Sequence, residues 1–522
     1  MDRTIPRTMS TQHPDNVNIP PWCRVEVMAG DDEVQEAYHA FRNLGCHEVM
    51  WDSEGKDADL HVVRKLLAAH SDYFRNKTLG CDLYLTYRVP NPRVETSERK
   101  VFTETLENLA VCFDVAHTFH GLDVPPVFEV ILPFTTESQE LLWVLNYYRK
   151  VIVDSGDVAI AGGVKVRDWI GEVNPKEINV IPLIEDYESL LRTDRILEGY
   201  IEAVGPRYVR AFIARSDPAL NYGLPVAVLL SKIALSKMRR VQNDTGIPIC
   251  PIVGVGSLPF RGHLSPANVE HFKEEFAGVY TVTIQSSYRY DHPQNDVQRT
   301  IKLLNETLPH GELPTVDADD EKLLTSAMQK LTAAYQKRVE SLGPLINYAA
   351  SFVPARRARK LHIGLFGYSR SVGKVVLPRA IPFVAAMYSL GVPPEFLGLE
   401  AVNNMTKEEE TAVKTHYKNL RRDLEAVAGF VSWENINMLT TMRDELESKL
   451  GVCLLTKDAW PMILSDLEAV ENHFNIKLGS KSLTQRKHDN AVNSFLISLL
   501  EKDDEEARKY LVEAARIRKS LG

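Results

Sequence analysis

The chain has 522 residues, of which 44% are hydrophobic and 25% are charged, and its formal net charge is −9. This composition is that of a folded globular protein, and the acidic balance argues against nucleic acid as the main partner. Because no apolar run reaches the length of a membrane span, the first residues lack an apolar export signal and the six cysteines lack paired spacing, we expect a cytoplasmic protein with reduced thiols and no membrane anchor.

The first segment of interest is RTMSTQHPDNVNIPP, residues 7–21. It is too rich in Pro, Asn and Ser for a helix or a strand, so we expect an ordered loop. The loop contains His13. By composition alone, a single histidine in a loop carries little functional signal.

From residue 23 to about residue 370, short apolar runs alternate with longer amphipathic runs. Eight strand signals separated by helical runs favour a (β/α)8 barrel over an open doubly wound sheet. The strands are predicted at 48–52, 82–89, 127–134, 178–186, 208–217, 247–257, 281–288 and 361–368. The helices are predicted at 32–44, 57–76, 95–119, 136–154, 187–203, 219–245, 265–277, 294–308 and 319–350.

Polar or glycine-rich residues follow nearly every predicted strand, as expected if the carboxyl ends of barrel strands hold the chemistry. Turns also favour such residues, so the pattern is only partial support for a site. The strand ends are Asp52, Arg88, Pro133, Glu185 with Asp186, Ser216 with Asp217, 254–257, Gln285 with Ser286, and 368–370.

Two acids end neighbouring predicted strands: Glu185 in INVIPLIED and Asp217 in YVRAFIARSD. Both strands read as buried on both faces, because their apolar residues do not alternate with polar ones. Two carboxylates brought to one edge of a parallel sheet suggest a site for a hard cation. The alternative that each acid only caps the following helix stays open.

Two basic segments could bind an anion. The segment 254–266, GVGSLPFRGHLSP, offers glycine-exposed N–H groups and Arg261, which suit a phosphate or a carboxylate, although a plain surface turn explains it about equally well. The second segment, 367–383, places Arg370, Lys374 and Arg379 within ten residues.

Residues 380–522 are almost wholly helical in pattern, with apolar residues at i, i+3, i+4 and i+7. We therefore predict two parts: a barrel with the N-terminal loop over residues 1–370, and a helical region over residues 371–522 that packs on the barrel and continues the site. No repeat or low-complexity linker separates the two parts.

Seven ordered motifs together resemble the short archaeal-type form of phosphoenolpyruvate carboxylase. The resemblance covers essentially the whole chain. The motifs are MSTQHPDN (9–16), IPLIED (181–186), ARSDPALNYG (214–223), GSLPFRGHLSP (256–266), IQSSYRYDHP (284–293), GYSRSVG (367–373) and LPRAIPFVAAMYSLGVPPEFLG (377–398).

The resemblance implies a helix-rich (β/α)8 barrel, a homotetramer and dependence on Mg²⁺ or Mn²⁺. It further implies irreversible carboxylation of phosphoenolpyruvate by bicarbonate, through carboxyphosphate and enolpyruvate, to give oxaloacetate and phosphate. Such a carboxy-lyase replenishes four-carbon acids. There are two alternatives. One is another Mg²⁺-dependent barrel lyase acting on phosphoenolpyruvate or pyruvate, and the other is a non-catalytic scaffold of the same fold.

Site residues follow from the matching motif positions. By resemblance, Glu185 and Asp217 are metal ligands and His13 is catalytic. The resemblance gives Arg261 and Arg379 both a catalytic and a substrate-binding role. It gives Arg370 and Arg167 a substrate-binding role alone. The glycine-rich loop of Arg261 would be a lid over the site. In the longer branch of the family this loop has a second arginine, where the present chain has Val255.

Overall fold

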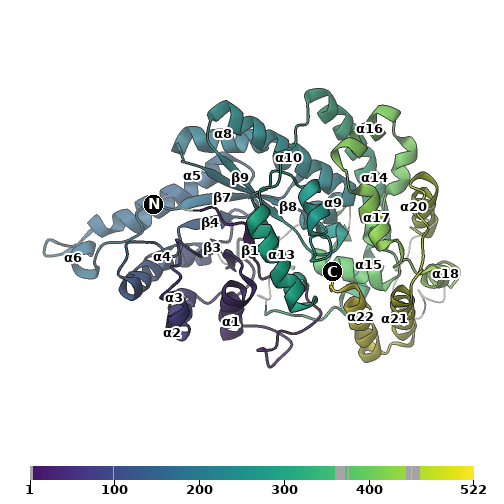
Figure 1. Cartoon of the computed structure of the whole chain (residues 1–522), viewed down its shortest axis with the longest axis horizontal. Coiled ribbons are helices and arrows are strands. Elements are labelled where there is room, and N and C mark those ends of the chain that lie inside the picture. Colours follow the sequence, from purple (N-terminus) through teal and green to yellow (C-terminus); the bar gives the residue numbers. More distant parts are fainter. Residues whose placement is uncertain (1–3, 98, 359–370, 373–374, 443–447, 449–458) are drawn as a thin grey trace.

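The computed structural model describes residues 4–97, 99–358, 371–372, 375–442, 448 and 459–522. Eight parallel strands form a closed barrel at the centre of the molecule (Figure 1), in the neighbour order β1-β10-β9-β8-β7-β4-β3-β2. The predicted (β/α)8 architecture is therefore confirmed. The barrel strands are β1 (Thr8–Ser10), β2 (Glu48–Asp52), β3 (Tyr84–Arg88), β4 (Glu129–Leu132), β7 (Asn179–Ile184), β8 (Val209–Ala214), β9 (Ile249–Gly254) and β10 (Thr281–Ile284).

Seven of these strands lie inside predicted strand ranges, but β1 does not. It lies in the segment 7–21, which was predicted to be loop throughout, so that prediction is wrong for residues 8–10. Three residues are too short for a strand pattern to be detected in the sequence. They form a strand because pairing with both β10 and β2 satisfies their backbone groups and buries Met9 completely. The predicted strand at 361–368 lies outside the described residues.

Helices surround the barrel close to the predicted positions. The long α10 is apolar on most sides and is largely buried between β-strands and outer helices, as expected of a central helix in a large protein. The helices of this part are α1 (Asp31–His39), α2 (Val62–Ala69), α3 (Ser71–Phe74), α4 (Arg99–His120), α5 (Ser138–Tyr147), α7 (Tyr187–Leu191), α8 (Thr193–Val204), α9 (Ser216–Tyr222), α10 (Leu224–Thr245), α11 (Val269–Glu275), α12 (Ser286–Tyr290), α13 (Gln294–Thr307) and α14 (Ala318–Ala350).

The remaining helices form a layer at the opposite end of the molecule from α6 (Figure 1). The long α14 joins this layer to the barrel, since it packs against α10 on one side and against α15, α16 and α20 on the other. One continuous hydrophobic core runs through both parts. The helices are α15 (Ala380–Ser389), α16 (Lys407–His416), α17 (Leu420–Ala428), α18 (Trp433–Thr441), α20 (Ala459–His473), α21 (Leu483–Glu501) and α22 (Asp504–Arg518).

No single helix of the described residues is long and apolar enough to cross a membrane. Only α15 taken together with the turns over 394–404 passes that test, as a sharply bent pair. These segments are buried within the helical layer.

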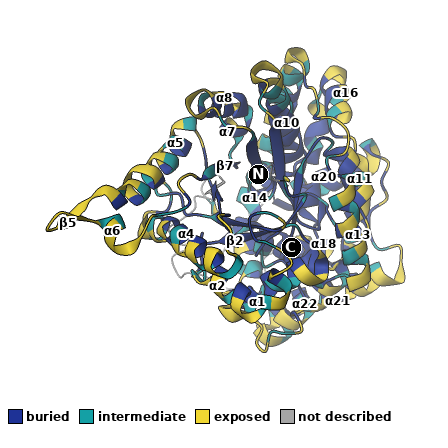
Figure 2. Ribbon diagram, turned by 60° about the vertical axis from the view of Figure 1, so that its left-hand side comes forward, coloured by how far each residue is buried: buried dark blue, intermediate teal, exposed yellow. Residues whose placement is uncertain are grey.

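A narrow arm projects from the barrel between α5 and β7 (Figure 2). It consists of β5 (Ala159–Ala161), β6 (Val164–Lys165) and α6 (Val166–Ile170). Because it connects a helix to the next strand, the arm belongs to the amino-end face of the barrel, opposite to the carboxyl ends of the strands. Trp169 and Ile170 on the arm are 75% and 62% exposed.

The barrel interior is charged at its amino end and apolar above. Arg210 of β8 donates to Glu48 of β2 at 2.7 and 2.9 Å and to Glu129 of β4 at 2.7 Å, and the Arg210 side chain is fully buried. A layer of apolar side chains closes the barrel over this cluster: Met9, Met50, Ile131, Ile181, Leu183, Phe212 and Ile252. The residues at the carboxyl ends of the strands thus lie above a closely packed apolar layer.

Replacing Arg210 by methionine is expected to lower the free energy of unfolding by about 3 kcal/mol or more, because two buried carboxylates lose their cation. Urea unfolding followed by circular dichroism measures the change. The control is Arg299→Met, whose side chain is 71% exposed and whose effect should stay within about 0.5 kcal/mol. Equal stability of the Arg210 variant and the parent chain would contradict the assignment of this cluster as structural.

Candidate active site

Glu185 and Asp217 lie at the carboxyl ends of two adjacent strands. Glu185 follows β7 and Asp217 lies in the first turn of α9, directly after β8. The parallel pairing of Ile184 with Ile213 sets the two strand ends side by side. The Glu185 carboxylate is buried and accepts a hydrogen bond from the N–H of Phe134 at 2.9 Å.

The alternative role of these acids as helix caps does not fit the structure. The N-cap of α7 is Asp186, which accepts from the N–H of Ser189, and the N-cap of α9 is Arg215. Burial raises the pKa of Glu185 well above its usual range, and the carboxylates of Asp217 and Glu54 raise it further. The site therefore gathers acids that repel one another.

An arginine stands beside this acidic group. Arg88, at the end of β3, donates to Asp52 at the end of β2 with N–O distances of 2.8 and 2.6 Å, and pairs with Glu54 at 3.1 Å. Its charge also acts on Glu185. Both Asp52 and Arg88 were noted as strand ends in the sequence, but Glu54 was missed, and its place two residues after a strand end was the available signal.

The pKa of Asp52 is about 2. Burial by itself raises this pKa, but Arg88 outweighs burial, with smaller contributions from Lys56 and His13. The folded pKa lies below the usual carboxyl value, so ionised Asp52 stabilises the fold above about pH 4, and this contribution disappears as the pH falls from about 4 to about 2.

We expect Asp52→Asn to weaken the pH dependence of stability in that window. At pH 6 the parent chain should be more stable than the variant by about 2 kcal/mol, and the difference should shrink as the pH falls from 4 towards 2. Thermal unfolding midpoints at closely spaced pH values measure both curves. Parallel curves for the two proteins would contradict the depressed pKa of Asp52.

The His13 loop lies over the same end of the barrel. His13 Nδ1 is 2.9 Å from the Thr11 hydroxyl, and the N–H of Asp52 donates to Gln12 Oε1 at 3.1 Å. The influence of His13 on the Asp52 carboxyl places the imidazole near that group. The structure thus brings His13 to the end of the barrel that carries Glu185 and Asp217.

Arg261 is fully buried, and each of its three guanidinium nitrogens donates to a protein acceptor. It donates to Ser216 Oγ at 3.1 Å, Asp15 Oδ2 at 3.0 Å, Gln285 Oε1 at 2.6 Å and the carbonyl of Gly522 at 2.7 Å. These contacts fit a guanidinium that ties the His13 loop to the β8–α9 turn. The predicted catalytic and substrate-binding role of Arg261 stays a prediction.

The loop around Arg261 is held by buried contacts. Phe260 beside it is fully buried, and its N–H donates to the buried carboxylate of Glu395 at 3.0 Å. In this conformation the loop is tightly packed, and its role as a lid stays a prediction.

The three other predicted arginines lie in different places. Arg379 is the half-buried N-cap residue of α15, a helix that packs against α9. Arg167 lies on α6 of the projecting arm and pairs with Asp157 and Glu172. The arm belongs to the opposite face of the barrel, so the structure does not bring Arg167 to the site within one chain. Arg370 lies outside the described residues.

The acidic pair fits a divalent cation by its chemistry. Burial and the neighbouring carboxylates of Asp217 and Glu54 raise the pKa of Glu185, a repulsion that a cation would relieve, and carboxylate oxygens suit Mg²⁺ and Mn²⁺. Within the described part of the chain, no three His, Cys, Asp or Glu side chains are arranged as a ready metal cluster. Two carboxylates with substrate and water in the other positions match the usual way Mg²⁺ is held.

A barrel with charged side chains gathered at the carboxyl ends of its strands defines the class of this protein as a (β/α)8-barrel enzyme. Comparison of sequences gives the family. A family model described as phosphoenolpyruvate carboxylase matches residues 5–522.

Relatives named phosphoenolpyruvate carboxylase match over the full length. They are 47% identical in Metallosphaera sedula and 45% in Caldivirga maquilingensis, covering 100% of both chains, and 43% in Picrophilus torridus, covering 99% of both. The chain belongs to the phosphoenolpyruvate carboxylase family, as its motifs predicted.

Proposed function

We propose that the protein carboxylates phosphoenolpyruvate with bicarbonate and releases oxaloacetate and phosphate. The observation that carries the proposal is the pair of carboxylates at adjacent strand ends, buried Glu185 and half-buried Asp217, with His13 at the same end, in a chain of this family. A lyase of this kind supplies four-carbon acids.

The proposed carboxylation proceeds in two steps. A bicarbonate oxygen attacks phosphorus, the bond from phosphorus to the enol oxygen breaks, and carboxyphosphate and the enolate of pyruvate result. Carboxyphosphate then loses a proton and separates into phosphate and CO₂, and the enolate carbon bonds to CO₂ to give oxaloacetate. Negative charge is greatest on the enolate oxygen and the phosphoryl group between the steps.

Each site residue has a role in this scheme. Glu185 and Asp217 would hold Mg²⁺ or Mn²⁺, and this cation would supply Lewis-acid stabilisation of negative oxygen, a contribution of several kcal/mol. His13 accepts the carboxyphosphate proton. Arg379, with Arg370, binds the phosphoryl and carboxylate groups. Arg88 balances Asp52 and Glu54, so these acids do not add repulsion near the anionic substrates.

Arg261 contributes by holding the site together in this scheme. Its bonds to Asp15 and Ser216 keep the His13 loop and the Asp217 turn in a fixed relation. A positioned base and a positioned cation are worth far more than mobile ones, because the geometry is set before the substrates react.

We also propose a homotetramer in the cytoplasm. The exposed apolar side chains of the arm support association, because a soluble chain rarely leaves such residues together in water (Figure 2). The five cysteines in the described part of the chain form no disulfide, which suits a reducing compartment.

The test of the function is oxaloacetate formation with each component withheld in turn. We expect product only with phosphoenolpyruvate, bicarbonate and Mg²⁺ or Mn²⁺ together, and one phosphate per oxaloacetate. Turnover of phosphoenolpyruvate or pyruvate that is independent of bicarbonate would instead indicate another barrel lyase.

A further inference from the structure

Arg215 stands between the candidate active site and the helical layer, and no predicted role includes it. It directly follows β8 and comes two residues before Asp217. Its side chain is 1% exposed, and none of its three guanidinium nitrogens has a hydrogen-bond partner in the part of the chain that the structure describes. Within the described residues it also forms no ion pair. A buried charge without a partner is costly, so the surroundings of Arg215 must compensate it in another way.

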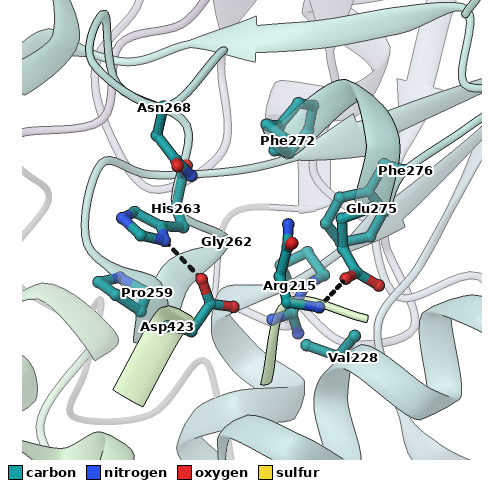
Figure 3. Close-up of a pocket in the computed structure, with 11 residues that line it drawn as sticks. Arg215, Val228, Pro259, Gly262, His263, Asn268, Phe272, Glu275, Phe276 and Asp423 are labelled. Carbon is teal, nitrogen blue, oxygen red and sulfur yellow. Dashed lines mark hydrogen bonds and ion pairs between the residues drawn. The ribbon is translucent and has the colours of Figure 1, made fainter. Parts of the chain in front are cut away.

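The side chain borders a small enclosed cavity. The cavity measures about 10 Å³, which is the room that one water-sized particle needs, and it is too small for bicarbonate or phosphate. Figure 3 shows Arg215 between Asp423 and Glu275, with the Gly262–His263 turn above. The walls come from the glycine-rich loop, α11 and the segment that leads into α17.

A carboxylate that can accept a further hydrogen bond faces the same cavity. Glu275 pairs with Lys232 at 2.7 Å through Oε1 and accepts from the N–H of Asn419 through Oε2, and a carboxylate has room for about four hydrogen bonds. Asp423 is already engaged by His263 and by the Tyr417 hydroxyl. The unpartnered donors of Arg215 and the Glu275 carboxylate therefore share a space that fits one water molecule.

We propose that Arg215 is a positioning residue for Asp217, anchored through one buried water that accepts from its guanidinium and donates to Glu275. The water would give the guanidinium an acceptor and link it to Glu275 as a solvent-bridged ion pair. Burial lowers the pKa of Arg215 to about 10, so the guanidinium remains charged at neutral pH.

The geometry of the β8–α9 turn explains how this anchor reaches the metal site. Arg215 fixes the first residue of the turn against α11, and Arg261 fixes the second through Ser216 Oγ. Asp217 is the third. Two anchored residues in succession leave little freedom to the backbone that carries the Asp217 carboxylate. Loss of the Arg215 anchor should therefore loosen the cation site before it affects substrate binding.

This inference rests on the proposed cation site, and its test uses Mg²⁺ itself. In Arg215→Gln we expect the Mg²⁺ concentration for half-maximal turnover to rise at least tenfold, with the KM for phosphoenolpyruvate changed less than threefold. The Mg²⁺-induced rise in thermal unfolding temperature, measured without substrate, should shift to higher Mg²⁺ by a similar factor. Arg215→Lys keeps the charge and should recover part of both responses.

Arg338→Gln is the matched control. Arg338 is also a buried arginine, but it pairs with Asp466 in the helical layer, so its loss should lower the unfolding temperature without moving the Mg²⁺ midpoint. If Arg215→Gln does not fold, Glu275→Gln tests the other end of the bridge, with the same expected shift.

Two results would overturn the inference: an unchanged Mg²⁺ midpoint in the folded Arg215 or Glu275 variants, or an equal shift in Arg338→Gln. A parent chain that shows no Mg²⁺ response at all would instead overturn the proposed cation site, so the two failures are distinguishable. A high-resolution crystal structure should further show one water bound between Arg215 and Glu275.

Discussion

Replacing Glu185 by glutamine is expected to lower kcat about 10³-fold or more while leaving the protein folded. In the proposed mechanism, the cation that this carboxylate helps to hold stabilises the developing negative charge by several kcal/mol. Every 1.4 kcal/mol of that stabilisation that is lost lowers the rate tenfold. Asp217→Asn should behave in the same way, because each variant leaves only one anionic ligand. Steady-state oxaloacetate formation at saturating Mg²⁺ measures the loss.

In metal-free buffer, the Glu185→Gln variant should be at least as stable as the parent chain, although it is far less active. The pKa of Glu185 is raised by burial and by neighbouring carboxylates, so the ionised form is unfavourable in the folded protein, and a neutral amide removes that cost. We therefore expect Glu185→Gln to unfold at an equal or higher temperature than the parent chain without metal. Added Mg²⁺ should raise the unfolding temperature of the parent chain but not that of the variant.

Glu188→Gln is the control, since Glu188 lies three residues along the chain with a side chain that is 67% exposed. Its turnover and its Mg²⁺ response should match those of the parent chain. Full activity of Glu185→Gln at saturating Mg²⁺ would remove Glu185 from the site, and a lower unfolding temperature without metal would contradict the unfavourable ionised state.

The architecture could be predicted from the sequence because most barrel strands are fully buried. Strands such as Asn179–Ile184 and Val209–Ala214 are mostly apolar without polar alternation, and the following acids mark where the strands end. The strand at Thr8–Ser10 could not be found in this way. Its three residues become a strand only because β10 and β2 lie on either side, which is information held by the fold and absent from the local pattern.

The candidate site was predicted only in part for a similar reason. Single residues at strand ends, such as Glu185 and Asp217, can be read from the chain, since position in a barrel strand fixes their direction. The hydrogen-bond partners of such residues cannot be predicted from the sequence so easily. Arg261 could be named from the chain, but its hydrogen bonds to Asp15, Gln285 and Gly522, which lie far from it in the sequence, form only in the fold.

Arg167 shows what a motif alone does not tell about position. Its role as a substrate arginine stays a prediction, and within one chain the topology places it in a helix-to-strand connection, on the face opposite to the strand ends. Arg215 shows the reverse case. Nothing in the letters ARSD distinguishes it from an ordinary turn residue, and only its burial without a partner marks it.

Replacing His13 by asparagine is expected to uncouple the two halves of the reaction. Attack of bicarbonate on phosphorus needs no base, so phosphoenolpyruvate should still be consumed and phosphate released. Without a group to accept the carboxyphosphate proton, release of CO₂ beside the enolate slows, and the enolate takes a proton and leaves as pyruvate. We expect oxaloacetate formation to fall about 10²- to 10⁴-fold, the range of general base catalysis.

The ratio of pyruvate to oxaloacetate measures this uncoupling directly, and ¹⁸O-labelled bicarbonate adds a second readout, because transfer of label into phosphate reports the first step alone. Asparagine can keep a hydrogen bond to Thr11, so the loop should hold its place. His117→Asn, with a side chain that is 49% exposed, is the control and should give oxaloacetate as the parent chain does. If His13→Asn makes oxaloacetate and phosphate in equal amounts at the parent rate, then another group accepts the proton, and the nearness of His13 to Asp52 has only an electrostatic meaning.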